Sequence, residues 1–507
     1  MIYTEQIVRE TLERGETFSV ECKLAKREIP GTFWESFSAF ANSDGGVIFL
    51  GVREENHEFT VEGVEDARKI VTDFWNMVHS PNKVSAEVVF ERNVQIVNCG
   101  GKNIVVVEVP RAERQDRPVY VGEDVFRGTF RRNGEGDYRC SREAVKAMIR
   151  DQGEITADAC MLEKRAVTDL NADTLRRYRT LFANLHPDHV WNRLPDDEFL
   201  MKIGAAKRGG DHKVHPTVAG LVCFADFNTI TDELPNFFLD YREHLSAGVR
   251  WTDRICSGDA TWSGNVFDFF FRISQSITAG VKVPFKIASD NVTRDDDTPV
   301  HKSIREVLAN ALIHADYNGR QGVVVEKYFK KLVISNPGSL RISKSVAIAG
   351  GTSDARNAKI FNIFSLVKIG ERSGFGLSQL YGTWESAGYA KPVFKESFDP
   401  DRMRIEVEFE VAEKVGKVAE KVAEKVGQVA EKVAEKAKDS HASITETEEK
   451  IVEMVRENPH VTQSAISIRI GLTRQYVGRC MDALQAKGVI RRVGPDKGGI
   501  WEVVGGI

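Results

Sequence analysis

The sequence predicts a multidomain α/β (α+β) protein, and three observations support this fold class. The chain has 507 residues, so three or four domains are expected rather than one hydrophobic core. Short apolar strands alternate with amphipathic helices as far as about residue 411. An 11-residue repeat then leads to a short basic C-terminal segment. The boundaries that we expect are 1–153, 154–297, 298–411, 412–442 and 443–507.

Composition and charge favour an ordinary cytoplasmic protein. The formal net charge is −4 and 42% of the residues are hydrophobic. A membrane helix needs roughly 18 apolar residues in a row, and no run of that length occurs; the start of the chain also lacks a basic and apolar leader. No membrane partner is therefore expected. The seven cysteines are scattered without paired metal-ligand spacing, which predicts reduced core residues.

The first segment, 1–153, alternates helices and strands. A helix is expected over 4–14, and a strand follows in which Phe18 and Val20 alternate with polar neighbours. An amphipathic helix over 33–42 and buried strands over 47–52 and 104–109 come next.

This segment resembles the Schlafen AlbA-type domain. The motifs are Glu21-Cys-Lys23, Ala39-Phe-Ala-Asn-Ser-x-Gly-Gly-x-Ile-x-x-Gly-Val52 and the arginine-rich stretch 126–134. The resemblance implies one of two activities. Some members bind nucleic acid, which would place phosphate contacts on Lys23, Arg127, Arg131 and Arg132.

Other members are RNA nucleases with two glutamates five residues apart and a later acid. Glu16 and Glu21 match that spacing, and Glu54 stands beside Arg53 where the third acid is expected. Three such carboxylates would hold a hydrolytic metal ion. The structural alternative for Glu21 and Lys23 is a cross-strand salt pair.

The next segment, 154–297, carries fewer signals. Helices are expected from Leu170 and over 197–203, and a buried helix or strand over 216–224. The aromatic residues of 237–242 and 267–271 indicate a packed core. In the regulators that this chain resembles, the corresponding segment connects the domain before it with the domain after it.

A helix over 298–317 has the most informative pattern. Thr298 is expected to accept an orphan backbone NH, and Pro299 suits the first helical position. Apolar residues recur at helical spacing at positions 304, 307, 308, 311 and 312. Glu306 and Asn310 lie on the opposite side, within about 40° of each other. They are either a functional pair or the polar back of an amphipathic helix.

Two strands, 323–328 and 332–335, follow, and the second leads into the turn Asn336-Pro-Gly338. A loop and an apolar helix occupy 350–369. Glycines 370, 374 and 376 then precede another helical pattern, as expected for a loop whose backbone NH groups bind phosphate.

In this order the motifs resemble the ATP-binding domain of the GHKL superfamily, in a divergent branch found in bacterial transcriptional regulators. The resemblance implies ATP and Mg²⁺ as cofactors, Asn310 as the metal ligand, and Glu306 as the residue that orients water if ATP is hydrolysed. The other implied cofactor-binding residues are His314, Asn336, Gly338, Arg356, Asn357, Gly374 and Gly376. Asn336 replaces the usual aspartate that accepts from the adenine amino group, which puts base selectivity in question.

The segment 412–442 is an 11-residue helical repeat, with residues 414–424 almost repeated as 425–435. Eleven residues in three turns predict a straight or right-handed supercoil. The valine stripe suggests homo-oligomerisation through 412–437; a partly helical charged spacer is the alternative, since valine and glycine are poor helix formers.

The last segment, 443–507, has the order helix, helix, turn, helix and hairpin, and it resembles the winged helix-turn-helix family. From 461 onward, five Arg and two Lys stand against three acids, as expected for duplex-DNA binding. Base-edge contacts are expected from Arg474, Gln475, Tyr476 and Arg479, and phosphate contacts from Arg491, Arg492 and Lys497. The alternative is a winged helix that docks protein.

Together these features predict an ATP-binding, DNA-binding bacterial regulator in which nucleotide state controls the arrangement of nucleic-acid-binding domains. The alternative is a metal-dependent nuclease of RNA or single-stranded DNA that uses Glu16, Glu21 and Glu54. The two hypotheses differ in whether the first segment binds or cleaves nucleic acid.

Overall fold

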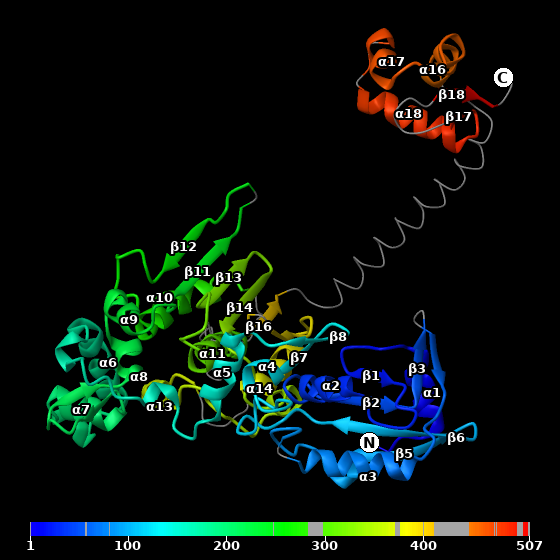
Figure 1. The fold of residues 1–507 in the computed structure, drawn as a ribbon. Helices are drawn as coiled ribbons and strands as arrows, with labels where there is room; N and C mark the ends of the chain where they lie inside the picture. The colour runs from blue at the N-terminus through cyan, green and yellow to red at the C-terminus, as the bar shows by residue number, and fades with distance from the viewer. Residues whose placement is uncertain are drawn as a thin grey trace. The chain divides into compact units, whose positions relative to one another are not determined.

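The computed structural model describes residues 2–55, 58–80, 82–246, 248–281, 298–370, 376–398, 400–409, 446–470, 472, 474–493 and 500–504. Contacts divide the chain into two compact units, 1–412 and 413–507. The expected repeat over 412–442 lies outside the described residues. Mixed helices and strands in several sheets confirm the predicted fold class (Figure 1).

The N-terminal domain is built on a four-stranded sheet in the order β1-β2-β6-β5. Its elements are α1 (Glu5–Glu13), β1 (Val20–Lys23), α2 (Gly31–Ala41), β2 (Gly46–Leu50), β3 (Val52–Glu55), β4 (Glu58–Val61), α3 (Ala67–Val78), β5 (Val94–Cys99), β6 (Lys102–Val109), α4 (Val125–Gly128), β7 (Phe130–Asn133), β8 (Gly136–Arg139) and α5 (Arg142–Gln152). The apolar faces of α2 and α3 pack on one side of the sheet, and α1 packs on the other.

Two strands of this domain differ from the sequence prediction. Phe18 lies in a turn before β1, so the first strand is shorter than its alternating pattern indicates. The expected strand 47–52 is divided at Gly51, whose φ of +99° ends β2 and starts the β3–β4 hairpin.

The middle of the chain is mostly helical. It contains α6 (Ala172–Leu185), α7 (Asp196–Ile203), β9 (Ala206–Arg208), β10 (Val214–Pro216), α8 (Val218–Phe224) and α9 (Phe227–Glu233). The sequence left open whether 216–224 forms a helix or a strand; the structure shows the helix α8 there. All of its residues from Ala219 onward are buried. This part shares one continuous core with the sheet domain that follows.

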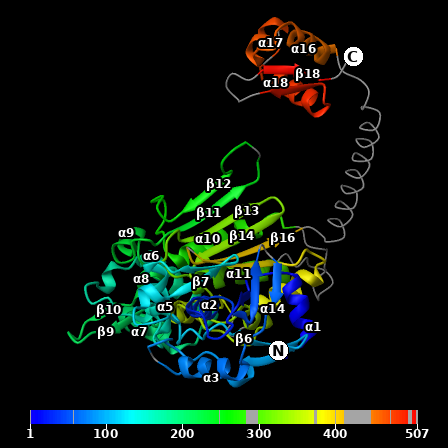
Figure 2. The same cartoon turned by 45° about the vertical axis from the view of Figure 1, so that its right-hand side comes forward.

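That domain has a six-stranded sheet in the order β12-β11-β13-β14-β16-β15. Its elements are β11 (Leu239–His244), β12 (Asp253–Cys256), α10 (Val266–Thr278), α11 (Pro299–His314), β13 (Val323–Tyr328), β14 (Lys331–Pro337), α12 (Lys344–Ala349), α13 (Ala358–Leu366), α14 (Gly376–Ser386), β15 (Val393–Ser397) and β16 (Arg402–Glu408). Helices α10, α11 and α14 cover one face of the sheet (Figure 2).

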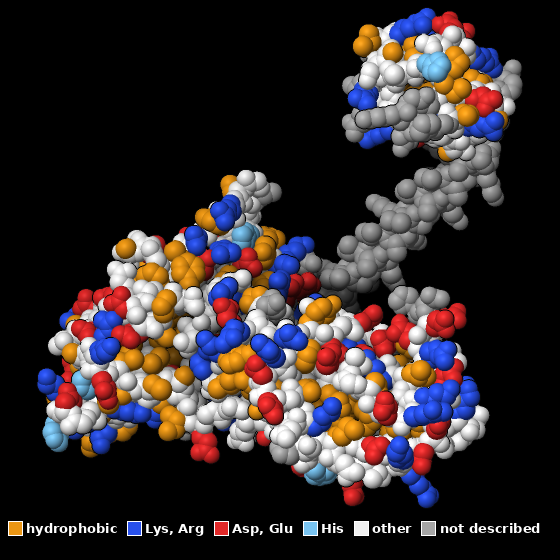
Figure 3. All heavy atoms as spheres, viewed as in Figure 1, with side chains coloured by type: hydrophobic (Ala, Val, Ile, Leu, Met, Phe, Trp, Pro, Cys, Tyr) orange, Lys and Arg blue, Asp and Glu red, His pale blue; other side chains and the backbone are white. Residues whose placement is uncertain are grey.

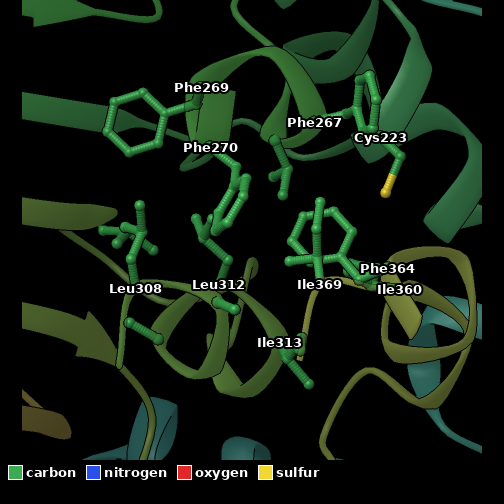
Figure 4. Close-up of a cluster of buried hydrophobic side chains, with 14 of the residues drawn as sticks. Cys223, Phe267, Phe269, Phe270, Leu308, Leu312, Ile313, Ile360, Phe364 and Ile369 are labelled. Atoms are coloured by element: carbon green, nitrogen blue, oxygen red, sulfur yellow. The ribbon is translucent and has the colours of Figure 1, made fainter. Parts of the chain in front are cut away.

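Helix α11 is buried because residues on most of its circumference are apolar. Leu308 and Leu312 point toward the phenylalanines of α10, and Phe364 of α13 approaches from the side (Figure 4). The expected cap is not formed, because the Thr298 hydroxyl pairs with the His301 ring at 2.8 Å and makes no side-chain bond to the helix backbone. The helix start at Pro299 is as predicted.

The turn expected at 336–338 begins later than predicted. Asn336 and Pro337 are still paired with β16, and Gly338, with φ +103°, is the first residue after β14. Helix α12 in the following loop was not expected from the sequence, since its six residues are too few for a clear helical period.

The second unit has three helices and a hairpin: α16 (Glu446–Glu457), α17 (Gln463–Ile470), α18 (Arg474–Ala486), β17 (Ile490–Val493) and β18 (Ile500–Val503). Its core contains Ile451, Val455, Val477, Leu484 and Trp501. The order of elements confirms the predicted winged helix-turn-helix.

Within the described part of the chain, none of the helices combines the length and apolar character needed to cross a membrane. The described cysteines are free thiols. Cys22, Cys99 and Cys223 are buried as expected, whereas Cys160 is exposed, so the prediction of core cysteines was wrong at that position.

The burial of α11 gives the first testable prediction. Leu308→Ala should lower the free energy of unfolding by about 2–5 kcal/mol, because it removes a fully buried side chain and leaves a cavity. Calorimetry of the full chain would measure this. Lys302→Ala, at an exposed position of the same helix, is the control and should change stability by less than about 0.5 kcal/mol. Equal effects of the two changes would contradict the assigned packing.

Candidate functional site

A large pocket lies in the six-stranded-sheet domain, between the sheet, α11, α14 and the segment that follows β14. Side chains from each of these elements line it. The floor is apolar and comes from the sheet, with Ile334, Phe394, Met403 and Ile405. Polar side chains line the opposite wall, so the pocket combines an apolar floor with a few polar groups.

Glu306 and Asn310 line this pocket from α11. Asn310 Nδ2 lies 3.4 Å from Glu306 Oε1, so the two side chains are adjacent, one helical turn apart. Both are half-buried. The pair therefore lines a pocket, and its role in binding stays a prediction.

Gly376, the first residue of α14, lies close to this pair. A Cβ atom at that position would stand 2.6 Å from Asn310 Nδ2 and 3.6 Å from Glu306 Oε1. A side chain at this position would therefore displace the Asn310 amide. Gly374, the other predicted glycine of this loop, lies outside the described residues.

His314 lines the pocket one turn after Asn310. Burial, reinforced by the nearby positive charges of Arg356 and Arg341, lowers the pKa of its imidazole to about 4. The ring is thus neutral at physiological pH and can donate one hydrogen bond and accept another.

Asn336 lies at the end of β14, buried at the pocket floor. Its Nδ2 donates to the Pro337 carbonyl at 3.3 Å, which leaves Oδ1 as the end of the amide that presents an acceptor. Gly338 does not line the pocket. A Cβ atom there would stand 1.8 Å from an Arg356 nitrogen, so this glycine makes room for that guanidinium.

Arg356 joins three parts of the first unit. Its guanidinium donates to the His314 carbonyl at 3.0 Å, to the Ser339 carbonyl at 2.9 Å, and to both oxygens of Asp151 at 3.1 and 2.7 Å. Because these bonds hold it in the pocket wall, Arg356 positions the pocket rather than reaching freely for a ligand. Asp151, in the last turn of α5, comes from the N-terminal domain.

Asn357 has a structural role. Its side-chain amide donates to the carbonyls of Ile313 and Ala315, both at 2.8 Å, and so caps the end of α11. Asn357 also lines a second, smaller pocket. The Arg-Asn motif is therefore used to fix α11 against the pocket wall.

The sequence analysis missed the pocket residues Arg341 and Asp354. Asp354 accepts from Arg114 of the N-terminal domain at 2.5 Å and lies 3.5 Å from Arg341. Arg341 is 6% exposed and donates to the Ala355 carbonyl at 3.0 Å. No local motif marks either residue, because their contacts with the N-terminal domain join positions 190 and 240 residues apart in the chain.

The same wall is held by three more arginines of the N-terminal domain. Arg111 forms a two-pronged ion pair with Glu396 of β15, at 2.8 and 3.1 Å, and both side chains are almost fully buried. Arg117 donates to the carbonyls of Leu340 and Arg341. Burial and the neighbouring arginines lower the pKa of Arg117 to about 9. Arg131 pairs with Asp401.

Two of the expected phosphate-binding arginines are therefore not available to nucleic acid. Arg131 is 5% exposed in the contact with Asp401, and Arg132 is fully buried between Glu21 and Asp137, at 2.6 and 2.9 Å. The prediction that they contact phosphates is wrong, because each neutralises a buried carboxylate. Of the four, only Arg127 is largely exposed, 3.5 Å from Asp124.

Lys23 and Glu21 form an ion pair within β1, so the expected salt pair exists but lies along one strand rather than across two. Glu16 accepts a hydrogen bond from the Cys22 backbone at 2.8 Å. Burial, and then the charges of Glu21 and Glu54, raise the pKa of Glu16 from its ordinary 4.5 to about 7. The three predicted acids are therefore brought near one another.

The expected metal site would lie among these three acids. No group of three or more His, Cys, Asp or Glu residues in the described ranges is arranged to hold a metal ion. Glu21 is paired with Lys23 and Arg132. Arg53, beside Glu54, lies 3.6 Å from Glu62. That Glu16, Glu21 and Glu54 hold a hydrolytic metal ion stays a prediction.

In the winged unit, Arg474, Tyr476 and Arg479 lie exposed on α18, with Gln475 between them. Arg491 of β17 pairs with Glu502 of β18 at 2.8 Å, and the Arg492 guanidinium lies 5.2 Å from the centre of the Trp501 ring. Lys497 and the side chain of Gln475 lie outside the described residues.

The raised pKa of Glu16 gives a second prediction. Between pH 4.5 and 7 the folded chain keeps a proton that the unfolded chain loses, so wild-type stability should fall as pH rises through this window. Glu16→Gln keeps an acceptor for the Cys22 amide but cannot ionise. By calorimetry it should be more stable than the wild type at pH 8, and the difference should shrink toward pH 5.

Glu13→Gln, at an exposed position of α1, is the matched control and should show no such pH-dependent gain. A Glu16→Gln variant whose advantage is the same at pH 5 and pH 8 would contradict the raised pKa.

The solved structures that are similar to this chain include the following two. One is the DIP2311 protein from Corynebacterium diphtheriae, with 16% identity over 98% of this chain and 96% of that chain, and a TM-score of 0.40. The other is the N-terminal domain of a "Putative ATP-dependent DNA Helicase RecG-related Protein" from Nitrosomonas europaea, with 25% identity over 28% of this chain and 95% of that chain, and a TM-score of 0.22. Both TM-scores are low, so neither similarity shows the fold or the function of this chain. No curated protein matches the chain.

Four family models match separate parts of the chain. Residues 16–141 match the Schlafen AlbA_2 model, and residues 146–240 match a domain of unknown function, DUF8451. Residues 321–406 match the model described as "Putative ATP-dependent DNA helicase recG C-terminal", and residues 444–491 match a winged helix-turn-helix DNA-binding model. The third match starts after α11. The chain therefore carries a Schlafen AlbA_2 domain, an ATPase-like domain of the recG C-terminal type and a C-terminal winged helix-turn-helix domain.

Proposed function

We propose that this protein is a nucleotide-responsive DNA-binding regulator: ATP with Mg²⁺ binds in the pocket between α11 and α14, and its presence alters how the nucleic-acid-binding domains are held. The three matched domains fit a DNA-binding regulator. The observation that carries the nucleotide part is the pocket itself, in which Glu306, Asn310 and Gly376 converge over an apolar floor.

The base would lie on the apolar floor. Ile334, Phe394 and Met403 offer surface for a flat ring, and Asn336 Oδ1 offers an acceptor for an exocyclic amino group. The phosphates would extend toward the start of α14, where backbone NH groups without a helical partner favour an anion.

The residues present fit a magnesium ion held mainly by phosphates. Mg²⁺ in nucleotide sites commonly takes one or two protein oxygens and fills its other positions with phosphate oxygens and water. Asn310 offers an amide oxygen and Glu306 a carboxylate oxygen. The Asn310 Nδ2 atom lies 3.4 Å from Glu306 Oε1. When bound, the ion would offset the charge of the phosphates. Glu306 would orient water if hydrolysis occurs.

The pocket wall is also the attachment site of the N-terminal domain, and this supports control by nucleotide. Arg341, Asp354 and Arg356 line the pocket, and Arg114 and Asp151 of the N-terminal domain bind them directly. A ligand that shifts this wall must strain or release these ion pairs, so its binding energy can change how the domain is held.

DNA binding would reside in the winged unit. Arg474, Tyr476 and Arg479 project from α18, the helix that enters the major groove in this class of fold. Arg491 and Arg492 of the hairpin would lie beside the phosphate backbone. Nuclease activity in the N-terminal domain is not part of the proposal, since Glu21 is already neutralised by two cations.

Nucleotide binding is tested by two glycine substitutions in the same helix. Gly376→Ala should weaken Mg·ATP binding by tenfold or more in calorimetric titration, because its methyl group displaces Asn310. Gly382→Ala, where a Cβ meets nothing within 4 Å, is the matched control and should bind as the wild type does. Asn310→Ala should also weaken the Mg²⁺-dependent part of binding. Wild-type affinity in Asn310→Ala would rule out its metal-ligand role.

Control by nucleotide is tested by hydrogen–deuterium exchange. Mg·ATP should change the exchange of residues 111–119 and 145–153, which hold the pocket wall, in the wild type but not in Gly376→Ala. In Arg114→Gln the same peptides should respond less, because Asp354 loses its link to the N-terminal domain. Tight ATP binding with no change in these peptides would contradict the coupling while leaving nucleotide binding intact.

A further inference from the structure

One face of α5 in the N-terminal domain carries a row of exposed cations. Arg142, Lys146 and Arg150 are four residues apart, so they lie along one side of the helix, roughly 6 Å apart along its axis. All three are exposed. In Figure 3, Lys and Arg side chains gather in the middle of the larger unit, over the region where Figure 1 labels α4 and α5.

Two further arginines extend this row, which we name the α5 cationic face: Arg139, Arg142, Lys146, Arg150 and Arg320. Arg139 ends β8, three residues before α5, and is exposed. Arg320, in the turn between α11 and β13, pairs with Glu143 of α5. The face therefore crosses from the N-terminal domain to the ATPase-like domain.

The face keeps an excess of positive charge. Two of its five cations have a carboxylate partner: Arg320 pairs with Glu143, and Arg150 lies 2.7 Å from Asp316. Within the described ranges, Arg142 and Lys146 have no ion-pair partner; the Arg142 guanidinium instead lies 4.4 Å from the centre of the Phe126 ring. That ring supports the guanidinium without neutralising it.

We propose that the α5 cationic face is a second duplex-DNA contact, which binds the phosphate backbone. The inference rests on the proposed function in one respect, that the chain binds DNA. It differs from what the family resemblance implied, because that resemblance pointed to Lys23, Arg127, Arg131 and Arg132, none of which belongs to this face.

Spacing and chemistry favour a phosphate backbone. Phosphates of one DNA strand follow each other every 3.4 Å along the helix axis. The three cations of α5 span roughly 12 Å, a length that covers three or four phosphates. Side chains of this kind provide non-specific affinity and position a protein on the duplex, while sequence is read elsewhere.

The position of α5 adds a functional consequence. Asp151 at its end binds Arg356 and Arg341 of the pocket wall, whereas Lys146 and Arg142 are exposed about 1.4 and 2.5 turns earlier. One helix therefore connects the nucleotide pocket to the cationic face. A change at the pocket wall would be transmitted to DNA contacts by displacement of this helix.

The test uses the full chain and a fluorescent 24-base-pair duplex, with anisotropy measured over a salt series. Arg142→Ala combined with Lys146→Ala should reduce the slope of log affinity against log salt by about 1.8, since each lost phosphate contact contributes about 0.9. At low salt the affinity should fall roughly tenfold or more. Both positions are exposed, so the unfolding temperature should not change.

Arg68→Ala combined with Lys69→Ala, on the exposed side of α3, removes the same charge elsewhere and should leave the slope near the wild-type value. Arg474→Ala combined with Arg479→Ala should lower affinity separately. Equal slopes for the α5 variant and the wild type would overturn this inference but not the proposed function. A loss confined to single-stranded DNA would overturn the choice of duplex, and absence of duplex binding by the wild type would overturn both proposals.

Discussion

The guanidinium of Arg356 is the contact on which the rest of the first unit depends. It bonds at once to the end of α11, to the turn after β14 and to Asp151 of the N-terminal domain. Burial of an arginine is costly unless its charge is paired and its NH groups are hydrogen-bonded, and these partners lower that cost for Arg356. Gly338 follows from the same constraint, because any side chain there would occupy the place of the guanidinium.

This arrangement explains why several arginines of the N-terminal domain bind groups of the neighbouring domain. Arg111, Arg114, Arg117 and Arg131 point into the ATPase-like domain, where carboxylates and loop carbonyls receive them. Removal of either member of such a buried pair typically costs about 3–5 kcal/mol, because a charge is left without a partner. The two domains therefore form one compact unit.

The buried and the exposed cations of the chain therefore have different roles. Arginines that bond buried carboxylates set the geometry of the pocket wall and of β1, and they are not accessible to nucleic acid. Exposed arginines and lysines occur on α5 and on α18 instead. Helix α5 belongs to both groups, since its last turn is fixed in the pocket wall and its outer side is charged and open to solvent.

The sequence by itself determined the elements and their order: the start of α11 at Pro299, the pairing of Glu306 with Asn310 on one side of it, and the helices and hairpin of the winged unit. These follow from local periodicity and backbone preferences, which the chain carries within a few residues. Only the tertiary structure decided which charges are buried. Arg132 and Arg127 have similar neighbours in the sequence, yet Arg132 is buried and Arg127 is exposed. The fold brings Glu21, 111 residues away, to Arg132, whereas Arg127 lies near Asp124, three residues away.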